Sequence, residues 1–393
     1  MLDRCRSTTC SALLVPLKLG GSAANLTRET RGTDLTGRCG PKHSPQVPHS
    51  ASPTCPPPGP APGLSCGPSF GPFCNISNSG CATLLPSVNP IIPIDLNWAG
   101  HPRSIASALL RSENSAALID PGPASTLPIL REQLALQNLT VSDLNAILLT
   151  HIHLDHAGAT GSLVRENPSL KVYVHSRGAA HLIDPSKLLH SALRLYGSEM
   201  DRLFGEFLPV PGGNLQVLEG GESLAMGPRQ LKVLYTPGHA SHHVTYFDVV
   251  SGTAFVGDTA GISIDGHPFI LPATPPPDIS IELWDASLDA IADLHPKRLF
   301  LTHFSFSDDP ALHIASYQER LHRWRDLTAS ILASNLDESA SMHRFAREIA
   351  AEAAQFLSPD EISHYVFNGA LHLSWLGLAR YHRKRTETQK PPL

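Results

Sequence analysis

The hydrophobic pattern of this chain changes character near residues 90 and 308. Between them, short apolar runs predict β-strands, and segments with helical spacing predict helices over 125–139, 157–167 and 281–294. The expected strands span residues 91–96, 104–110, 115–120, 145–149, 171–174, 215–218, 231–236, 244–250, 253–258 and 298–302. Strands that first form hairpins and then alternate with helices indicate two sheets covered by helices, a layered α/β body.

Beyond residue 308 the pattern becomes helical. Apolar residues recur at helical spacing over 311–332, and further helices are expected at 341–357, 359–367 and 370–385. We interpret residues 309–393 as a helical extension that packs on a body formed by residues 87–308. Two long connections in that body, 175–208 and 261–280, are expected to be loops that form the walls of a pocket.

Residues 1–86 have a different composition from the rest. They are rich in Ser, Thr, Gly and Pro, with eleven prolines between Pro41 and Pro72. Such a segment buries too little apolar surface to offset the entropy lost on ordering, so it is predicted to be disordered. All seven cysteines lie here, between Cys5 and Cys81, with irregular spacing and no CxxC pair. The body therefore uses neither disulfides nor thiolate metal ligands.

Charge and hydropathy narrow the classes of partner. Residues 91–393 carry 23 Lys and Arg against 32 Asp and Glu, a balance that disfavours nucleic acid as a partner. No apolar run approaches the ~20 residues of a membrane span, so no membrane span is expected. The expected partner is a small-molecule substrate. We expect a cytoplasmic location; the opening residues, in which Arg4 and Arg6 precede an apolar run interrupted by Pro16 and Lys18, leave a secretory signal as the alternative.

The segment 148–158, LLTHIHLDHAG, carries the densest chemistry. His151, His153, Asp155 and His156 directly follow an aliphatic run. Neutral imidazole and carboxylate oxygen are the usual donors for zinc and similar ions, and two histidines two apart on an extended segment point to the same side. Because Asp155 and His156 begin a turn into a helix, they can face a second ion. The segment therefore predicts a metal site.

Further donors follow predicted strands downstream. His239 lies in LYTPGHASHH, Asp258 in AFVGDT and His303 in LFLTHFS. Any one of these could be an ordinary core or surface residue. Together they follow β-rich runs in order, and strand ends on one edge of a sheet converge in space.

The motifs THIHLDHAG, TPGHASHH, FVGDT and LTH, in this order, resemble the metallo-β-lactamase superfamily, and TPGHASHHVTYF is especially similar to its glyoxalase II branch. The resemblance covers residues 91–305 and implies a four-layer αββα sandwich with the site at one edge of both sheets. It makes His151, His153 and His239 ligands of a first metal, and Asp155, His156 and His303 ligands of a second. Asp258 would bridge the two.

The resemblance also gives roles to neighbouring side chains. Asp120 matches a family carboxylate that accepts an imidazole N–H behind a ligand, although Asp before Pro-Gly is also ordinary turn chemistry. His243 matches the last histidine of the pattern TPxHxxGH, where a structural role is favoured over ligation. His242 stands where that pattern has glycine, and its side chain is expected to narrow the rim of the pocket.

These assignments predict a dinuclear metal-dependent hydrolase that uses a metal-bridging hydroxide on an ester, thioester or lactone. Two divalent ions ~3.5–4 Å apart can share a hydroxide and polarise a carbonyl, and Asp155 is the candidate catalytic residue that orients it. Zinc is the expected metal, with iron and manganese as alternatives. The alternative functions are a mononuclear iron persulfide dioxygenase, a metal-dependent nuclease or phosphodiesterase of the same fold, and a binding protein. The oligomeric state stays open.

Deletion of residues 1–86 is expected to leave folding and hydrolysis intact, because every expected metal donor lies after residue 150. The measurement compares circular dichroism and hydrolysis rates of the full and shortened chains. A shortened chain that folds but is inactive would show that the segment contributes to function.

Overall fold

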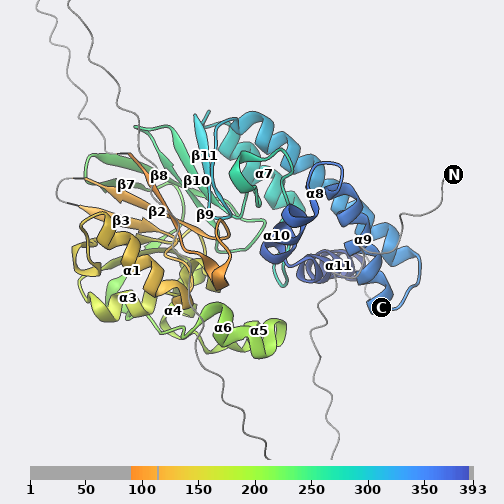
Figure 1. Ribbon diagram of the computed structural model, residues 1–393, viewed down its shortest axis with the longest axis horizontal. Helices are drawn as coiled ribbons and strands as arrows, with labels where there is room; N and C mark the ends of the chain where they lie inside the picture. The colour runs from red at the N-terminus through yellow and green to blue at the C-terminus, as the bar shows by residue number, and fades with distance from the viewer. Residues whose placement is uncertain (1–89, 113–114, 389–393) are drawn as a thin grey trace, which may run out of the picture. The chain divides into compact units, whose positions relative to one another are not determined.

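The computed structural model describes residues 90–112 and 115–388; the predicted disordered segment 1–86 lies outside them. The order of elements begins with strands β1 to β3, passes through mixed strands and helices, and ends in four helices (Figure 1). Of the described helices, none has both the length and the apolar character needed to cross a bilayer.

Two six-stranded sheets form the body. The first has the order β1 (Ile92–Asp95), β2 (Ala106–Arg111), β3 (Ala116–Ile119), β4 (Ala146–Leu148), β5 (Lys171–His175) and β6 (Leu215–Leu218). The second has the order β12 (Ser305–Ser307), β11 (Arg298–Leu301), β10 (Thr253–Gly257), β9 (Val244–Asp248), β8 (Arg229–Tyr235) and β7 (Ser223–Met226). Strands β3 to β6 run parallel, as do β10 and β11; the other neighbours are antiparallel.

Helices lie between the strands in sequence and cover the sheets. Those of the body are α1 (Leu127–Leu136), α2 (Leu154–Ala157), α3 (Thr160–Glu166), α4 (Ser176–Ile183), α5 (Ser186–Tyr196), α6 (Met200–Phe204) and α7 (Ile281–Ala292). The extension consists of α8 (Pro310–Ala333), α9 (Glu338–Ala353), α10 (Pro359–Gly369) and α11 (Leu371–Thr388). Short 3₁₀ helices include η1 (Trp98–Gly100), η2 (Ala124–Thr126) and η3 (Val141–Asp143).

Three apolar clusters show how the layers pack. The central cluster takes alternate residues of β2, Ala106, Ala108 and Leu110, together with Val233 and Phe255 of the second sheet. A second cluster joins the outer face of the first sheet to α1 and α3, and a third joins the second sheet to α7 and the extension. This arrangement is the predicted αββα sandwich. The extension shares one continuous core with the second sheet.

Four details differ from the sequence prediction. The connection 175–208, predicted to be a loop, contains α4, α5 and α6. The helix predicted over 157–167 is the shorter α3, and the single-turn α2 precedes it. The helix predicted over 341–357 begins at Glu338, because the Asp337 carboxylate caps it by accepting the N–H of Ala340 at 2.7 Å. Strands β7 and β12 were not predicted, since they are short and contain serine.

One buried ion pair links β8 and β9. The Arg229 guanidinium donates to the Asp248 carboxylate, and both side chains are essentially inaccessible to solvent. Asp248 also accepts the Ser251 hydroxyl at 2.7 Å and the Val250 N–H at 3.1 Å. A carboxylate held in this way stays buried when its cation is removed.

Substitution Arg229→Met is therefore expected to lower the free energy of unfolding by about 3–5 kcal/mol, because it leaves Asp248 buried without its partner. Urea denaturation monitored by circular dichroism measures this free energy of unfolding. The control is Arg131→Ala, which breaks the exposed pair with Glu166 and should cost about 0–1 kcal/mol. Equal effects of the two substitutions would contradict the role of the buried pair.

Candidate metal centre

The seven predicted donors come together where strands of both sheets end. On the first sheet, β4 is followed by the extended residues His151 and His153 and by Asp155 and His156 in α2. On the second sheet, His239 follows β8, Asp258 directly follows β10, and His303 follows β11. The donors form two groups, His151, His153, His239 and Asp258 in one and Asp155, His156 and His303 in the other, with the atoms of each group within 4.8 Å of one another.

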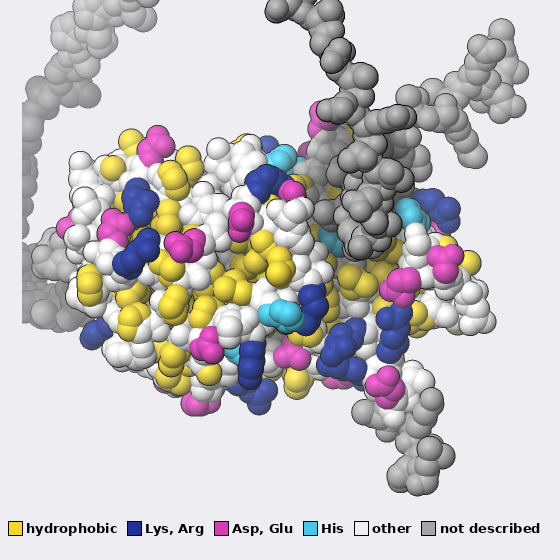
Figure 2. Space-filling view, turned by 90° about the horizontal axis from the view of Figure 1, so that it is seen from below, with side chains coloured by type: hydrophobic (Ala, Val, Ile, Leu, Met, Phe, Trp, Pro, Cys, Tyr) yellow, Lys and Arg dark blue, Asp and Glu magenta, His cyan; other side chains and the backbone are white. Residues whose placement is uncertain are grey.

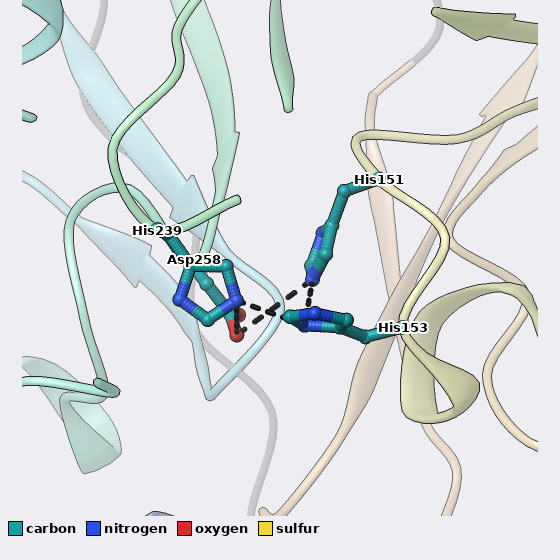
Figure 3. Close-up of side chains that lie close together, drawn as sticks. All are labelled: His151, His153, His239 and Asp258. Carbon is teal, nitrogen blue, oxygen red and sulfur yellow. Dashed lines mark hydrogen bonds and ion pairs between the residues drawn. The ribbon is translucent and has the colours of Figure 1, made fainter. Parts of the chain in front are cut away.

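In the first group, three imidazole nitrogens face a common centre (Figure 3). His153 Nδ1 lies 2.9 Å from Nε2 of His151 and 2.9 Å from Nε2 of His239. The Oδ2 atom of Asp258 lies 3.3 Å from His239 Nε2 and 4.0 Å from His151 Nε2. These donors come from opposite sheets and point toward one another.

In the second group, Asp155 Oδ2 lies 3.4 Å from Nε2 of His303 and 3.9 Å from Nε2 of His156. The other oxygen of Asp258, Oδ1, lies 3.2 Å from His156 Nε2 and 3.5 Å from His303 Nε2. Asp258 therefore turns one carboxylate oxygen toward each group, and it stands between them.

Hydrogen bonds on the outer ring nitrogens orient four of the histidines. Nδ1 of His239 donates to the Ala273 carbonyl at 2.9 Å, and Nδ1 of His303 donates to the Ser104 carbonyl at 2.8 Å. Nδ1 of His156 lies 2.8 Å from Asp120 Oδ2, and Nδ1 of His151 lies 3.1 Å from Thr150 Oγ1. Because Nδ1 carries the hydrogen, the Nε2 lone pair of each ring is left for a ligand in the centre.

The donor atoms are arranged as they would be around a bound cation, rather than for hydrogen bonding to one another. Ligand nitrogens around one tetrahedral zinc lie roughly 3.3 Å apart at the usual zinc–nitrogen distances, and His153 Nδ1 lies 2.9 Å from each of the other two inward nitrogens. Among the described residues, buried His156 Nε2 and Asp258 Oδ1 have no hydrogen-bond partner. Buried polar atoms are rarely left in this state, so both atoms indicate a missing cationic partner.

The two donor groups differ in the direction in which the pKa values of their histidines are shifted. Burial lowers the pKa of His151 well below its ordinary value and that of His153 to about 3, and neighbouring imidazoles add to both shifts. Burial opposes protonation of His156 too, but the carboxylates of Asp258, Asp155 and Asp120 outweigh it and raise its pKa. The first group therefore contains neutral imidazoles, the form that binds metal, and the second gathers negative charge around His156.

Asp120 connects the two sheets behind the donors. Its buried carboxylate accepts the Thr150 N–H at 2.8 Å and hydroxyl at 2.6 Å, the Thr302 hydroxyl at 2.9 Å, and Nδ1 of His156. Its backbone has φ of 50°, which aspartate tolerates better than most residues. Of its two sequence interpretations, the contact with His156 agrees with the supporting role.

His243 lies beside the donors rather than among them. Its buried ring stacks on His151 with centroids 4.9 Å apart, and its Nδ1 lies 3.0 Å from Thr236 Oγ1. Gly257, with φ of 49°, leaves room for it: a Cβ at that position would come within 2.6 Å of both His243 Nε2 and Thr150 Oγ1. The half-buried ring of His242 lies 5.6 Å from that of His153, next to the centre.

Sequence reasoning missed several supporting groups. Thr150 and Thr302 each directly precede a donor histidine, in LTHIH and LTH, and this shared Thr-His pair was the available signal. The Ala273 carbonyl could not be found in this way, because any residue supplies a carbonyl. Ala273 lies in the connection 261–280, which was expected to be a pocket wall; its carbonyl supports His239 from behind.

Comparisons with known proteins agree with this geometry. The family model for the Metallo-beta-lactamase superfamily matches residues 101–303. A metallo-beta-lactamase fold-containing protein from Sulfurisphaera tokodaii is 30% identical over 168 residues, 41% of this chain and 60% of the relative. A hydroxyacylglutathione hydrolase from Aeromonas hydrophila is 33% identical over 151 residues, 38% of this chain and 44% of the relative. The chain thus spans about half the length of the curated relatives it matches.

A solved structure supports the fold independently. The metallo-beta-lactamase family protein from Thermus thermophilus aligns with a TM-score of 0.56 and 21% identity, over 76% of this chain and 93% of its own. This likeness concerns the arrangement of sheets and helices.

Substitution Asp120→Asn is expected to weaken metal binding by roughly 10- to 100-fold, because the carboxylate that orients His156 loses its charge. Competition with a chromophoric chelator measures the affinity, and circular dichroism checks the fold. The control is Asp143→Asn, which alters the exposed Asp143–Thr140 capping box of η3 and should leave affinity unchanged. Unchanged affinity in Asp120→Asn would limit Asp120 to a turn residue.

Proposed function

Because this chain belongs to the metallo-beta-lactamase superfamily, we propose that it is a metal-dependent hydrolase that holds two divalent ions and cleaves an ester, thioester or lactone. The single observation that carries the proposal is Asp258, whose Oδ1 and Oδ2 face different donor groups. One carboxylate placed between two sets of inward nitrogens suits a bridging ligand.

The roles of the side chains follow from their positions. His151, His153 and His239 hold one ion, Asp155, His156 and His303 hold the other, and Asp258 joins them. When bound, such a pair of ions supplies an acidic water and polarises a carbonyl oxygen. Zinc suits this donor set, as do iron and manganese.

Asp155 is the candidate that orients the attacking water. Its side chain is 25% exposed and His153 is also partly exposed, whereas the other five donors are at most 6% exposed. Burial raises its pKa, but His156 and His303 outweigh burial and lower it to about 2. Asp155 is therefore a carboxylate at neutral pH, and its oxygens can accept a hydrogen bond from water on the open side of the centre.

The class of substrate is supported by the relatives. Relatives from Aeromonas and Synechococcus are named as hydrolases of a hydroxyacyl-glutathione, an acyl group carried by glutathione. The proposed mechanism needs no serine or cysteine nucleophile, and residues 82–393 contain no cysteine. We therefore place acyl transfer to water first among the reactions of this site.

The purified chain is expected to contain about two metal ions and to hydrolyse members of a panel of thioesters and lactones. Substitution Asp258→Ala should remove both ions together and abolish hydrolysis, because it removes the carboxylate that both ions would share. Elemental analysis and the panel measure these outcomes, with Asp143→Asn as the matched control outside the centre.

Two results would overturn the proposal. One iron per chain with oxygen consumption on glutathione persulfide would identify the dioxygenase, which needs only residues matching His151, His239 and Asp258. Cleavage of phosphodiesters but of no acyl substrate would identify the phosphodiesterase.

A further inference from the structure

Asp258, the carboxylate between the two donor groups, lies in a tight turn directly after β10. The Thr259 N–H donates to the Val256 carbonyl at 2.9 Å, and the Gly261 N–H donates to the Asp258 carbonyl at 3.1 Å. We call residues 258–261 the Asp258 turn. Because an aspartate side chain is short, the position of this turn decides whether its two oxygens reach both donor groups.

Two side chains from different helices donate hydrogen bonds to the Asp258 turn. Nε1 of Trp284 in α7 donates to the Thr259 carbonyl at 2.7 Å. Nε2 of His313 in α8 donates to the Ala260 carbonyl at 2.9 Å. Because a carbonyl only accepts, Nε2 of His313 carries the hydrogen, and its Nδ1 accepts from the Ser307 hydroxyl at 3.0 Å. Each of the first two residues after the bridging carboxylate is thus held by its own donor.

Helices α7 and α8 meet at the Asp258 turn. Both pack on β10 and β11 (Figure 1), and the rings of Trp284 and Tyr317 have centroids 5.9 Å apart. At Gly261, where φ is 74°, a Cβ would come within 2.4 Å of the Tyr317 ring. The end of the turn therefore lies directly against α8, and only glycine fits there.

The contacts to the Asp258 turn are shielded from water. At the surface shown in Figure 2, hydrophobic side chains lie among charged ones. By contrast, Trp284, His313 and Tyr317 are at most 5% exposed. Water therefore does not replace the two donors, and a carbonyl that loses its donor here stays buried and unpaired at a cost in free energy.

Helix α7 also holds the segment that carries His239. At Gly238 a Cβ would come within 2.4 Å of Trp284 Cα, so the chain before His239 lies directly against α7. The Ser287 hydroxyl donates to the Pro237 carbonyl at 2.6 Å, and the Trp284 ring lies 5.5 Å from that of His239. Trp284 therefore contacts the segments of both donors that the second sheet contributes to the first group.

The support reaches beyond the part of the chain that resembles the family. His313 and Tyr317 lie in α8, the first helix of the extension, after residues 101–303 that the family model matches. The extension is thus joined to the donor centre by a buried hydrogen bond as well as by apolar packing.

We propose that Trp284 and His313 are positioning residues that hold the Asp258 turn so that its carboxylate faces both donor groups, which makes α8 of the extension part of the metal centre. The inference rests on the proposed function for the two ions. It adds that their affinity depends on two side chains that bind neither of them.

The first test titrates metal-free protein with cobalt(II) in a calorimeter. His313→Leu, which removes the donor at similar size, should weaken binding roughly 3- to 10-fold, because the ions must then order a turn that has lost one hydrogen bond. His313→Gln, whose amide N–H can take the place of Nε2–H, should restore most of the affinity. The control His322→Leu removes a contact with Asp285 from the same helix and should leave cobalt binding unchanged.

The second test uses Trp284→Phe, which keeps the aromatic ring and removes the N–H. It should weaken cobalt binding to a similar extent, and its matched control Trp375→Phe removes a buried indole donor to Glu338 within the extension. Electron paramagnetic resonance of the manganese(II)-loaded proteins then reports whether one carboxylate still joins the ions. Spin coupling should be reduced in Trp284→Phe and His313→Leu and retained in both controls, whatever the Tm of each variant.

The outcomes separate this inference from the proposed function. Cobalt affinity and spin coupling that are equal in Trp284→Phe, His313→Leu and the unchanged protein would overturn the inference, even if the protein hydrolyses acyl substrates. Binding as weak in His313→Gln as in His313→Leu would overturn the role of that hydrogen bond. If His313→Leu does not fold, the comparison of Trp284→Phe with Trp375→Phe decides. Two bound ions without hydrolysis of any acyl substrate would instead overturn the proposed function.

Discussion

The inward ring nitrogens of His151, His153 and His239 present neutral lone pairs to one another, an arrangement that a cation between them would stabilise. The crowding at His153 Nδ1, which faces two other ring nitrogens at 2.9 Å, shows this constraint most directly. The surroundings fix the donors in place instead of relieving the crowding. Outer nitrogens of the histidines are tied to protein oxygens, so the rings cannot turn their lone pairs away from the centre.

The spacing of the donors depends on how the two sheets pack. His151 and His153 extend from the first sheet and His239 and Asp258 from the second, so the thickness of the central apolar layer sets the gap between them. Asp120 fixes this gap on the polar side, because one carboxylate accepts from Thr150 of the first sheet, Thr302 of the second and the donor His156. Packing and ligand geometry are thus coupled through one residue.

Much of this could be predicted from sequence, because strand runs that each end in His or Asp must meet at a sheet edge. The layers and the clustering of donors followed from that pattern and from the resemblance. The helices α4 to α6 were missed because Pro185 and Gly197 divide their segment into short pieces, although α4 and α5 each have an apolar face. The ring contacts among Trp98, Tyr196, Phe204 and Phe367 were missed because only tertiary packing brings these residues together.

The division between what was predicted and what was missed has a physical basis. The donors lie on strand ends whose geometry is common to many sequences, so a short motif is enough to predict a metal centre. Elements outside the sheets, such as η1, α5, α6 and α10, meet through side-chain packing that no short motif encodes. Changes in those helices can alter the fit to a substrate without moving a donor, so the metal chemistry and the choice of substrate are separable properties of this fold.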